Sequence, residues 1–266
     1  MNVPVSTSAA ARRSPGGIPP LPPQSGPYRL DFATGIESLE AAQRLRYEVF
    51  NLELEEGLEA SHRTGLDCDR FDAHCHHLII REKDSNAVVG TYRMQTAGMA
   101  AAGEGFYSAT EFRLEDLPHP VLDAALEIGR ACIDRRHRNL KVLYLLWQGL
   151  GHYVRHNRLG FLFGCCSLTS QDPHEATRVF RKLEANNQLD SRYRVHPLPP
   201  LSCLIDDPDP GSAHIPRLMR AYLSLGATIC SEPAIDRVFG TIDYLALFDL
   251  ATMSPARLAF FTGFRA

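Results

Sequence analysis

Apolar residues recur at helical spacing in several stretches of the chain. Between residues 37 and 53 this spacing predicts a helix, whose buried face is formed by Leu39, Ala42, Val49 and Phe50. Residues 140–157 predict a longer amphipathic helix. Its inward face is formed by Leu143, Leu146, Trp147, Leu150 and Tyr153. Residues 174–184 and 215–226 predict two further helices.

Short runs rich in β-branched and aromatic residues predict the strands. These runs are residues 28–30, 77–80, 87–94, 126–133, 160–167 and 243–250. The polar residues 83–86 read as a turn between the second and third strands. Helices alternate with the later strands, which is typical of a mixed α/β domain whose middle strands are parallel.

The first 27 residues differ in composition from the rest of the chain. They contain seven of the 18 prolines and three glycines. Such a segment buries too little apolar surface to order itself, so we expect a disordered tail over 1–27. Residues 28–266 are then expected to form a single domain with a C-terminal extension.

Composition narrows the class of protein. A hydrophobic content of 44% and a charged content of 22% are those of a globular protein. The net charge of −3 argues against a general nucleic-acid binder. Seven cysteines without a CxxC pair, and an N-terminus without a continuous apolar run, predict reduced thiols and a cytoplasmic location. No GxGxxG or GxxxxGK[ST] motif is present, so no nucleotide cofactor is predicted.

The small net charge hides an asymmetric distribution. Residues 31–60 carry eight acidic and two basic groups, whereas residues 130–160 carry seven basic groups and one acidic group. The basic groups cluster where a predicted strand turns into the helix at 140–157. Backbone N–H groups and the helix dipole favour phosphate at such a point, although a basic run is also typical of a solvated surface. The candidate phosphate-binding residues are Arg135, Arg136, Arg138, Asn139 and Lys141.

Three charged residues lie within otherwise apolar elements. Arg46 lies on the apolar face of the first helix, and it needs either an anionic ligand or a structural carboxylate as its partner. Glu127 and Arg130 lie within one apolar strand, where a bulge at Gly129 would turn both toward one pocket. They form either a buried structural ion pair or a catalytic site in which Glu127 accepts a proton.

Metal-capable side chains are dense between Asp69 and His77, but they alternate in direction along a strand. We therefore predict no metal site.

Five segments of the sequence, in order, resemble the GNAT-like N-acyltransferases. They are LRYEVFNLELEEG (45–57), DCDRFDAHCHHLII (67–80), VVGTYRMQ (88–95), EIGRACIDRRHRN (127–139) and the C-terminal block 215–250. Within that group the chain is most similar to the ornithine-lipid (lyso-ornithine lipid) N-acyltransferases, also known as haemolysin-like acyltransferases. The C-terminal block distinguishes these from shorter relatives.

A more distant resemblance is to the acyl-homoserine-lactone synthases. It implies substrate-binding roles for Arg46, Phe50, Asp69, Asp72 and Arg93, and catalytic roles for Glu127 and Arg130. The arginines would either grip the carboxylate of an amino acid or organise the acidic loop. Those synthases usually carry a tryptophan soon after the first helix, whereas the single tryptophan here is Trp147.

The resemblance implies a GNAT-like mixed sheet with splayed central parallel strands flanked by helices. It also implies transfer of a (3-hydroxy)fatty acyl group to the α-amine of ornithine, which gives lyso-ornithine lipid. The expected donor is the acyl-phosphopantetheine thioester of acyl carrier protein, whose acidic surface suits the basic turn. Because the product is a lipid, we also expect peripheral contact with the inner face of the membrane, through Phe260, Phe261 and Phe264. The alternatives are N-acylation of another amino acid and a signal synthase of the lactone type.

Overall fold

Eight strands form one mixed sheet in the structure, which is a computed structural model that describes residues 16–22, 24–206 and 212–262. The strands are β1 (Tyr28–Phe32), β2 (His76–Glu82), β3 (Val88–Thr96), β4 (Ala125–Ile133), β5 (Phe161–Leu168), β6 (Thr228–Ile229), β7 (Ala234–Asp236) and β8 (Thr241–Asp249). Their order across the sheet is β1-β2-β3-β4-β5-β8-β6, and β7 also pairs with β8. Only β4 and β5 pair in parallel. The predicted mixed sheet is confirmed.

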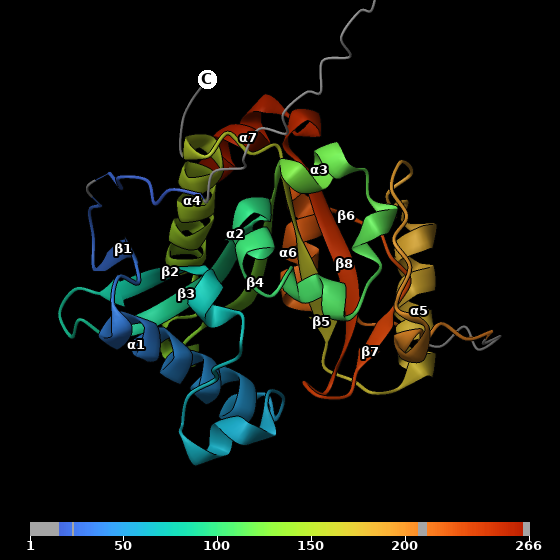
Figure 1. Cartoon of the computed structure of the whole chain (residues 1–266), viewed down its shortest axis with the longest axis horizontal. Helices are drawn as coiled ribbons and strands as arrows, with labels where there is room; N and C mark the ends of the chain where they lie inside the picture. Colours follow the sequence, from blue (N-terminus) through green and yellow to red (C-terminus); the bar gives the residue numbers. More distant parts are fainter. Residues whose placement is uncertain (1–15, 23, 207–211, 263–266) are drawn as a thin grey trace, which may run out of the picture.

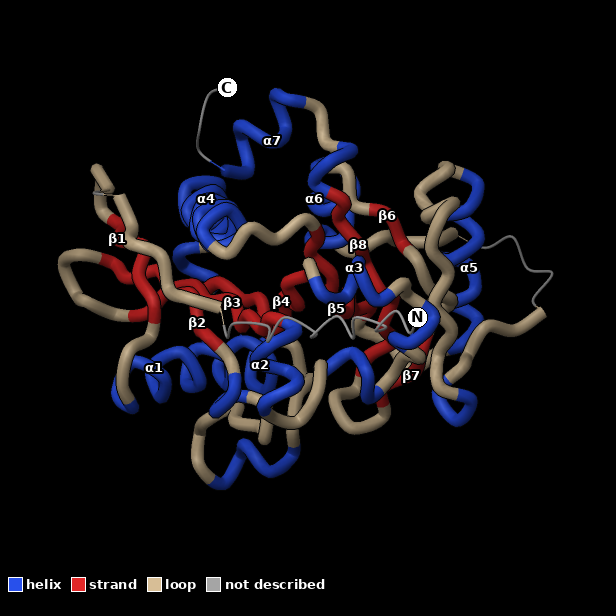
Figure 2. Tube along the Cα trace, turned by 45° about the horizontal axis from the view of Figure 1, so that its top comes forward, coloured by secondary structure: helices blue, strands red, loops and turns tan. Residues whose placement is uncertain are grey.

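Helices cover both faces of this sheet (Figure 1). They are α1 (Ile36–Tyr47), α2 (Ala97–Ala102), α3 (His119–Asp123), α4 (Leu140–His156), α5 (Pro173–Ala185), α6 (Arg217–Leu225) and α7 (Pro255–Thr262). Figure 2 shows α1 below the sheet and α4 above it. Helices α5 and α6 pack into the same core as α4. We refer below to the face that α1 covers as the α1 face.

Strand β8 shows why the sheet has two apolar faces. Its alternate residues Ile242, Tyr244, Ala246 and Phe248 belong to the large core under α4, whereas Leu245 and Leu247 belong to a smaller core on the other side. Successive side chains of a strand point to opposite faces, so an unbroken apolar run indicates a strand buried on both sides. By the same alternation, the side chains of Asp243 in β8 and Glu127 in β4 point to the α1 face.

The two parallel strands separate in the middle of the sheet. Pairing between β4 and β5 covers three residue pairs and ends at Glu127 opposite Phe163. On its other edge β4 contains a bulge, because Thr91 pairs with Cys132 while Arg93 pairs with Gly129. The extra residue lies next to Gly129, as predicted. Arg130 has a φ of 49°, a left-handed conformation that is unusual for a residue other than glycine.

Gly164 of β5 lies against β4 where the strands part. A Cβ atom at this position would overlap the carbonyl oxygen of Ile128, which belongs to the backbone and cannot rotate away. We expect Gly164→Ala to lower the free energy of unfolding by about 1–3 kcal/mol through this overlap. The control is Gly160→Ala, because nothing lies within 4 Å of a Cβ there. Equal midpoints for the two variants in urea titration would contradict this account.

The structure differs from the predicted elements at several points. The helix predicted over 37–53 ends at Tyr47 and continues as a π-helical segment, Glu48–Glu53, which leaves Phe50 buried. Residues 97–102, which lie outside the predicted helices and strands, form α2. The short helices and strands α3, α7, β6 and β7 were not predicted. They carry too few residues to show a period in the sequence.

Part of the proline-rich segment is described and contacts the domain. Residues 16–22 and 24–27 include no helix or strand, yet Gly17 donates a hydrogen bond to Asn157 at 2.7 Å and Leu21 packs against the large core. Residues 1–15 and 23 lie outside the described residues. Within the described ranges no helix combines the length and apolarity needed to cross a membrane.

Candidate functional site

Three arginines and three aspartates form a closed ring of ion pairs on the α1 face of the sheet. Arg46 comes from α1, Arg93 from β3 and Arg130 from the bulge of β4. The aspartates Asp67, Asp69 and Asp72 come from the loop before β2. We call these six residues the Arg–Asp ring.

Each member of the Arg–Asp ring contacts two members of opposite charge. Arg46 pairs with Asp67 at 2.9 Å and with Asp72 at 2.6 Å. Arg93 pairs with Asp72 at 3.1 Å and with Asp69 at 2.6 Å. Arg130 pairs with Asp69 at 3.0 Å and with Asp67 at 3.7 Å. The ring is therefore electrically neutral, as buried charges must be to avoid a large desolvation cost.

The arginines of the ring lower the pKa values of Asp69 and Asp72. Burial opposes ionisation of Asp72, but Arg46 and Arg93 hold the pKa of Asp72 well below its usual range. Burial also opposes ionisation of Asp69, but Arg93 and Arg130 favour it more strongly, so the pKa of Asp69 is lowered as well. Because a neighbouring cation favours the ionised form, these carboxylates stay charged throughout the physiological range.

Aromatic rings pack against two of the three arginines, Arg93 and Arg130. The guanidinium of Arg130 lies 4.3 Å from the ring centroid of Phe239 and 5.4 Å from that of Tyr107. Arg46 has no exposed surface and contacts Asp67 and Asp72 instead of the cavity. All three arginines contact the acidic loop, which one of the two predicted alternatives requires, while Arg93 and Arg130 also line the cavity described next.

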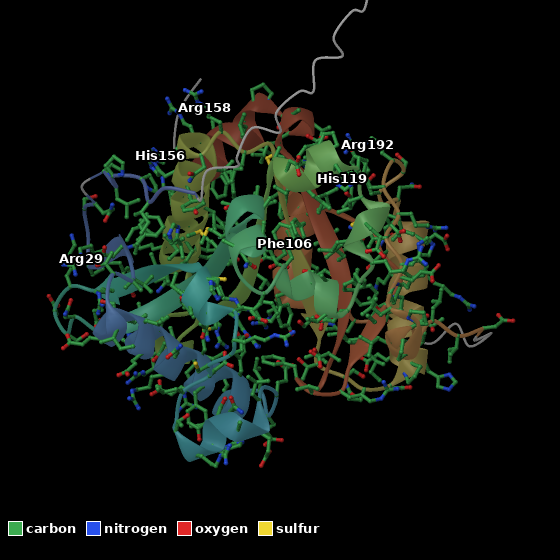
Figure 3. The ribbon with its side chains drawn as sticks, in the orientation of Figure 1. Arg29, Phe106, His119, His156, Arg158 and Arg192 are labelled. Atoms are coloured by element: carbon green, nitrogen blue, oxygen red, sulfur yellow. The ribbon has the colours of Figure 1, made fainter. Side chains whose placement is uncertain are left out.

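A cavity of about 230 Å³ opens where β4 and β5 separate. Phe50, Arg93, Glu127 and Arg130 line it, so four of the predicted site residues come together there. Arg46, Asp69 and Asp72 lie behind this wall, in the Arg–Asp ring. Phe106, at the centre of Figure 3, packs its ring edge against Phe163 of β5, which also lines the cavity, at a centroid distance of 5.1 Å.

Glu127 is the acid that faces the cavity at the point of separation. Its two carboxylate oxygens accept hydrogen bonds from the backbone N–H groups of Tyr107 at 2.9 Å and of Ser108 at 2.7 Å. Burial raises the pKa of Glu127, although these donors and Arg93 act in the opposite direction. A carboxylate with a raised pKa, held in one orientation, is suited to accept a proton from an amine.

The predicted phosphate-binding residues lie at the start of α4, and several of them already have partners. Arg136 pairs with Asp134 at 2.8 Å, and Arg138 pairs with Glu53 at 2.6 Å. Asn139 caps α4 by accepting from the N–H groups of residues 141 and 142. Arg135 and Lys141 are exposed, and neither forms an ion pair with any residue in the described ranges.

Sequence reasoning missed several residues of this region. Asp67 closes the Arg–Asp ring, and the need of three buried arginines for three acids was the signal that could have identified it. Tyr107 and Ser108 hold Glu127 through backbone groups, which leave no trace in side-chain identity. A group of three acids, Glu111, Asp236 and Asp243, lies in parts of the chain that show no motif.

Comparison with known proteins identifies the family to which the chain belongs. Residues 45–148 match the family model described as "Acetyltransferase (GNAT) domain". This range includes the predicted site residues from Arg46 to Lys141. The L-ornithine N(alpha)-acyltransferase of Brucella abortus (strain 2308) is 30% identical over 255 residues, which are 89% of each chain. The enzyme of the same name from Rhizobium meliloti (strain 1021) is 30% identical over 86% of this chain and 82% of its own.

Among solved structures, the AHL synthase LasI matches 90% of this chain and 96% of its own, with 12% identity and a TM-score of 0.47. The family assignment rests on the sequence relatives. Their identity of 30% extends over nearly the whole of both chains, and the GNAT domain covers the residues of the site. The chain is therefore an acyltransferase that belongs to the family of the L-ornithine Nα-acyltransferases.

Proposed function

We propose that this protein transfers a (3-hydroxy)fatty acyl group from acyl carrier protein to the α-amine of ornithine and so makes lyso-ornithine lipid. The observation that carries the proposal is the buried carboxylate of Glu127, which faces a cavity where two parallel strands separate. The relatives support ornithine as the acceptor, since both are named L-ornithine N(alpha)-acyltransferase.

The reaction needs a base, a place for the thioester and a site for the amine. Glu127 takes a proton from the α-amine, whose nitrogen attacks the thioester carbonyl. The new C–N bond forms as the C–S bond breaks, and the proton taken by Glu127 passes to the leaving pantetheine sulfur, which departs as a thiol. Backbone N–H groups of β4 beyond Glu127, where pairing with β5 has ended, hold the carbonyl oxygen. Such donors typically contribute about 3–4 kcal/mol to transition-state stabilisation.

The test is to incubate the purified protein with 3-hydroxyacyl carrier protein and each of the twenty standard amino acids or ornithine. We expect a product with the mass of the ornithine amide, together with free carrier thiol. An amide with a different amino acid, or a lactone, would assign the protein to one of the alternative classes. No amide with any amine would overturn the acyltransferase assignment.

The donor site that we propose for acyl carrier protein is the surface around the start of α4. Arg135 and Lys141 are exposed there, and Leu52 and Leu140 expose 58% and 82% of their surface. Uncompensated cations beside exposed leucines suit a partner that is acidic and partly apolar. This surface lies at the end of β4, the strand that borders the cavity.

Reversing two charges tests this docking surface. We expect Arg135→Glu combined with Lys141→Glu to raise KM for the acyl carrier protein about tenfold, because electrostatic attraction becomes repulsion. The control is Arg158→Glu, at the opposite end of α4 in Figure 3. Steady-state assays compare acyl carrier protein with a short acyl-pantetheine thioester. An equal change with both donors would contradict a carrier-docking role.

Two of the three phenylalanines predicted to contact the membrane are described, and Phe260 leaves 43% of its surface exposed. Phe261 is buried, and the ring of Phe260 packs on α4 against Tyr144 and Trp147 at centroid distances of 4.9 and 6.0 Å. Phe264 lies outside the described residues. Peripheral contact with the inner face of the membrane therefore stays a proposal that follows from the lipid nature of the product.

A further inference from the structure

Three carboxylates converge beside the cavity, on the same sheet face as Glu127. Glu111, Asp236 and Asp243 each offer an oxygen, and these oxygens all lie within 4.8 Å of one another. We call them the acidic cluster. Asp243 itself lines the cavity, and so do Ser108 and Cys165, which separate Glu111 from it. The Sγ atom of Cys165 lies 3.5 Å from the Ser108 hydroxyl and 3.7 Å from Glu111.

The acidic cluster has polar neighbours but no cation. Asp243 accepts hydrogen bonds from Ser167 at 2.5 Å and from Thr241 at 3.0 Å, and Asp236 accepts one from Tyr107 at 3.2 Å. Within the described residues, no arginine, lysine or histidine forms an ion pair with any member. In the Arg–Asp ring, by contrast, each carboxylate pairs with two arginines.

Glu111 is the member that points to a ligand. It is 2% exposed, and its Oε2 atom is buried without a hydrogen-bond partner. A fourth acid, Glu56, lines the cavity and has a buried Oε1 atom without a partner. Because burial raises the pKa of Glu111 and of Asp243, their protonated forms are favoured in the free protein, and the ionised cluster needs a positive group that no described residue supplies.

We infer that the acidic cluster binds the side-chain ammonium of the amino acid acceptor and so selects a diamino acid over a neutral one. This inference rests on the proposed function. An ammonium group has three N–H donors, which match three convergent carboxylates. Ser108 connects the two halves of the site, since its backbone holds Glu127 and its hydroxyl contacts Cys165 beside Glu111. The acceptor would place its α-amine at Glu127 and its side chain toward the cluster.

The pKa values of Glu111 and Asp243 agree with this reading. Burial and the neighbouring acids Asp243 and Asp236 raise the pKa of Glu111 well above its ordinary value. Burial raises the pKa of Asp243 to about 6. A bound cation would favour the ionised forms, as the arginines do for Asp69 and Asp72. A divalent metal ion is the competing occupant. Calcium and magnesium usually take six or more ligands, and Asp236 and Asp243 already accept other donors.

The experiment compares ornithine with norvaline, which has the same carbon chain without the terminal amine. For the wild-type protein we expect kcat/KM to favour ornithine strongly. Glu111→Gln and Asp243→Asn should each lower the ratio of the two kcat/KM values about tenfold to hundredfold, since each removes one charge-assisted hydrogen bond. The control is Glu115→Gln, an exposed acid on the same segment as Glu111, which should leave the ratio unchanged.

A second measurement needs no variant. Ornithine should raise the melting temperature of the wild-type protein more than norvaline does at equal concentration. Equal kcat/KM for the two acceptors, or an unchanged ratio in both folded variants, would overturn the inference while leaving acyl transfer intact. Stoichiometric divalent metal in the purified wild-type protein, lost in Glu111→Gln, would assign the cluster to a metal instead. Failure to acylate any amine would overturn the proposed function itself.

Discussion

Replacement of Glu127 by glutamine should lower the turnover of acyl transfer by about 10²- to 10⁴-fold, the usual contribution of a general base. Glutamine has nearly the same shape and can still accept a hydrogen bond from Tyr107 or Ser108, but it cannot take a proton from the amine. The single-turnover rate with a saturating acyl donor measures the effect directly.

The pH profile separates the base from a structural residue. Burial raises the pKa of Glu127, and the base acts in its deprotonated form. The wild-type kcat at saturating ornithine should therefore rise with pH through a pKa above the ordinary glutamate value, and this limb should be absent in Glu127→Gln. Glu115→Gln, with an exposed acid, serves as the control. Equal turnover of wild type and Glu127→Gln would exclude Glu127 as the base.

The second large effect is expected from Arg46→Met. This change leaves Asp67 and Asp72 buried with one cation fewer, so the Arg–Asp ring carries a net negative charge. Removing one partner of a buried ion pair typically costs about 3–5 kcal/mol. Urea unfolding should show a loss of this size. Arg44→Met changes an exposed arginine of the same helix and should cost less than about 0.5 kcal/mol.

The same variant should alter the dependence of stability on pH. Because the pKa of Asp72 is lowered by folding, its ionisation stabilises the protein above the unfolded pKa, and this stabilisation is lost as the pH falls toward the folded pKa. Without Arg46 the folded pKa of Asp72 moves back toward its ordinary value, so the loss below about pH 4 should be shallower. A variant with wild-type stability and acid dependence would show that the ring pair contributes nothing.

The sequence predicts the sheet better than it predicts the site. Strands β2 to β5 and β8 are visible because apolar runs of ordinary strand length are bounded by turns, and α4 because its apolar face spans many residues. The continuation of α1 as a π-helix is not visible, since Phe50 keeps its apolar character in either geometry. Elements of two to five residues carry too little periodicity to be recognised.

Site residues could be predicted only where the charge conflicts with its surroundings. Arg46, Glu127 and Arg130 attract attention because each interrupts an apolar element. Asp67 lies in a polar loop, where one more acid is unremarkable, although it is buried without exposure. Glu111 and Asp243 become neighbours only when β8 lies beside β5, a pairing between distant parts of the chain that the order of elements leaves open.

The closed form of the Arg–Asp ring has a consequence for how this protein can diverge. Each aspartate is shared by two arginines from different elements, so no member can be replaced alone by a neutral residue without leaving a net charge in the interior. Loss of one arginine together with one aspartate restores neutrality. We therefore expect neutralising substitutions at these six positions to be tolerated only when one arginine and one aspartate are replaced together.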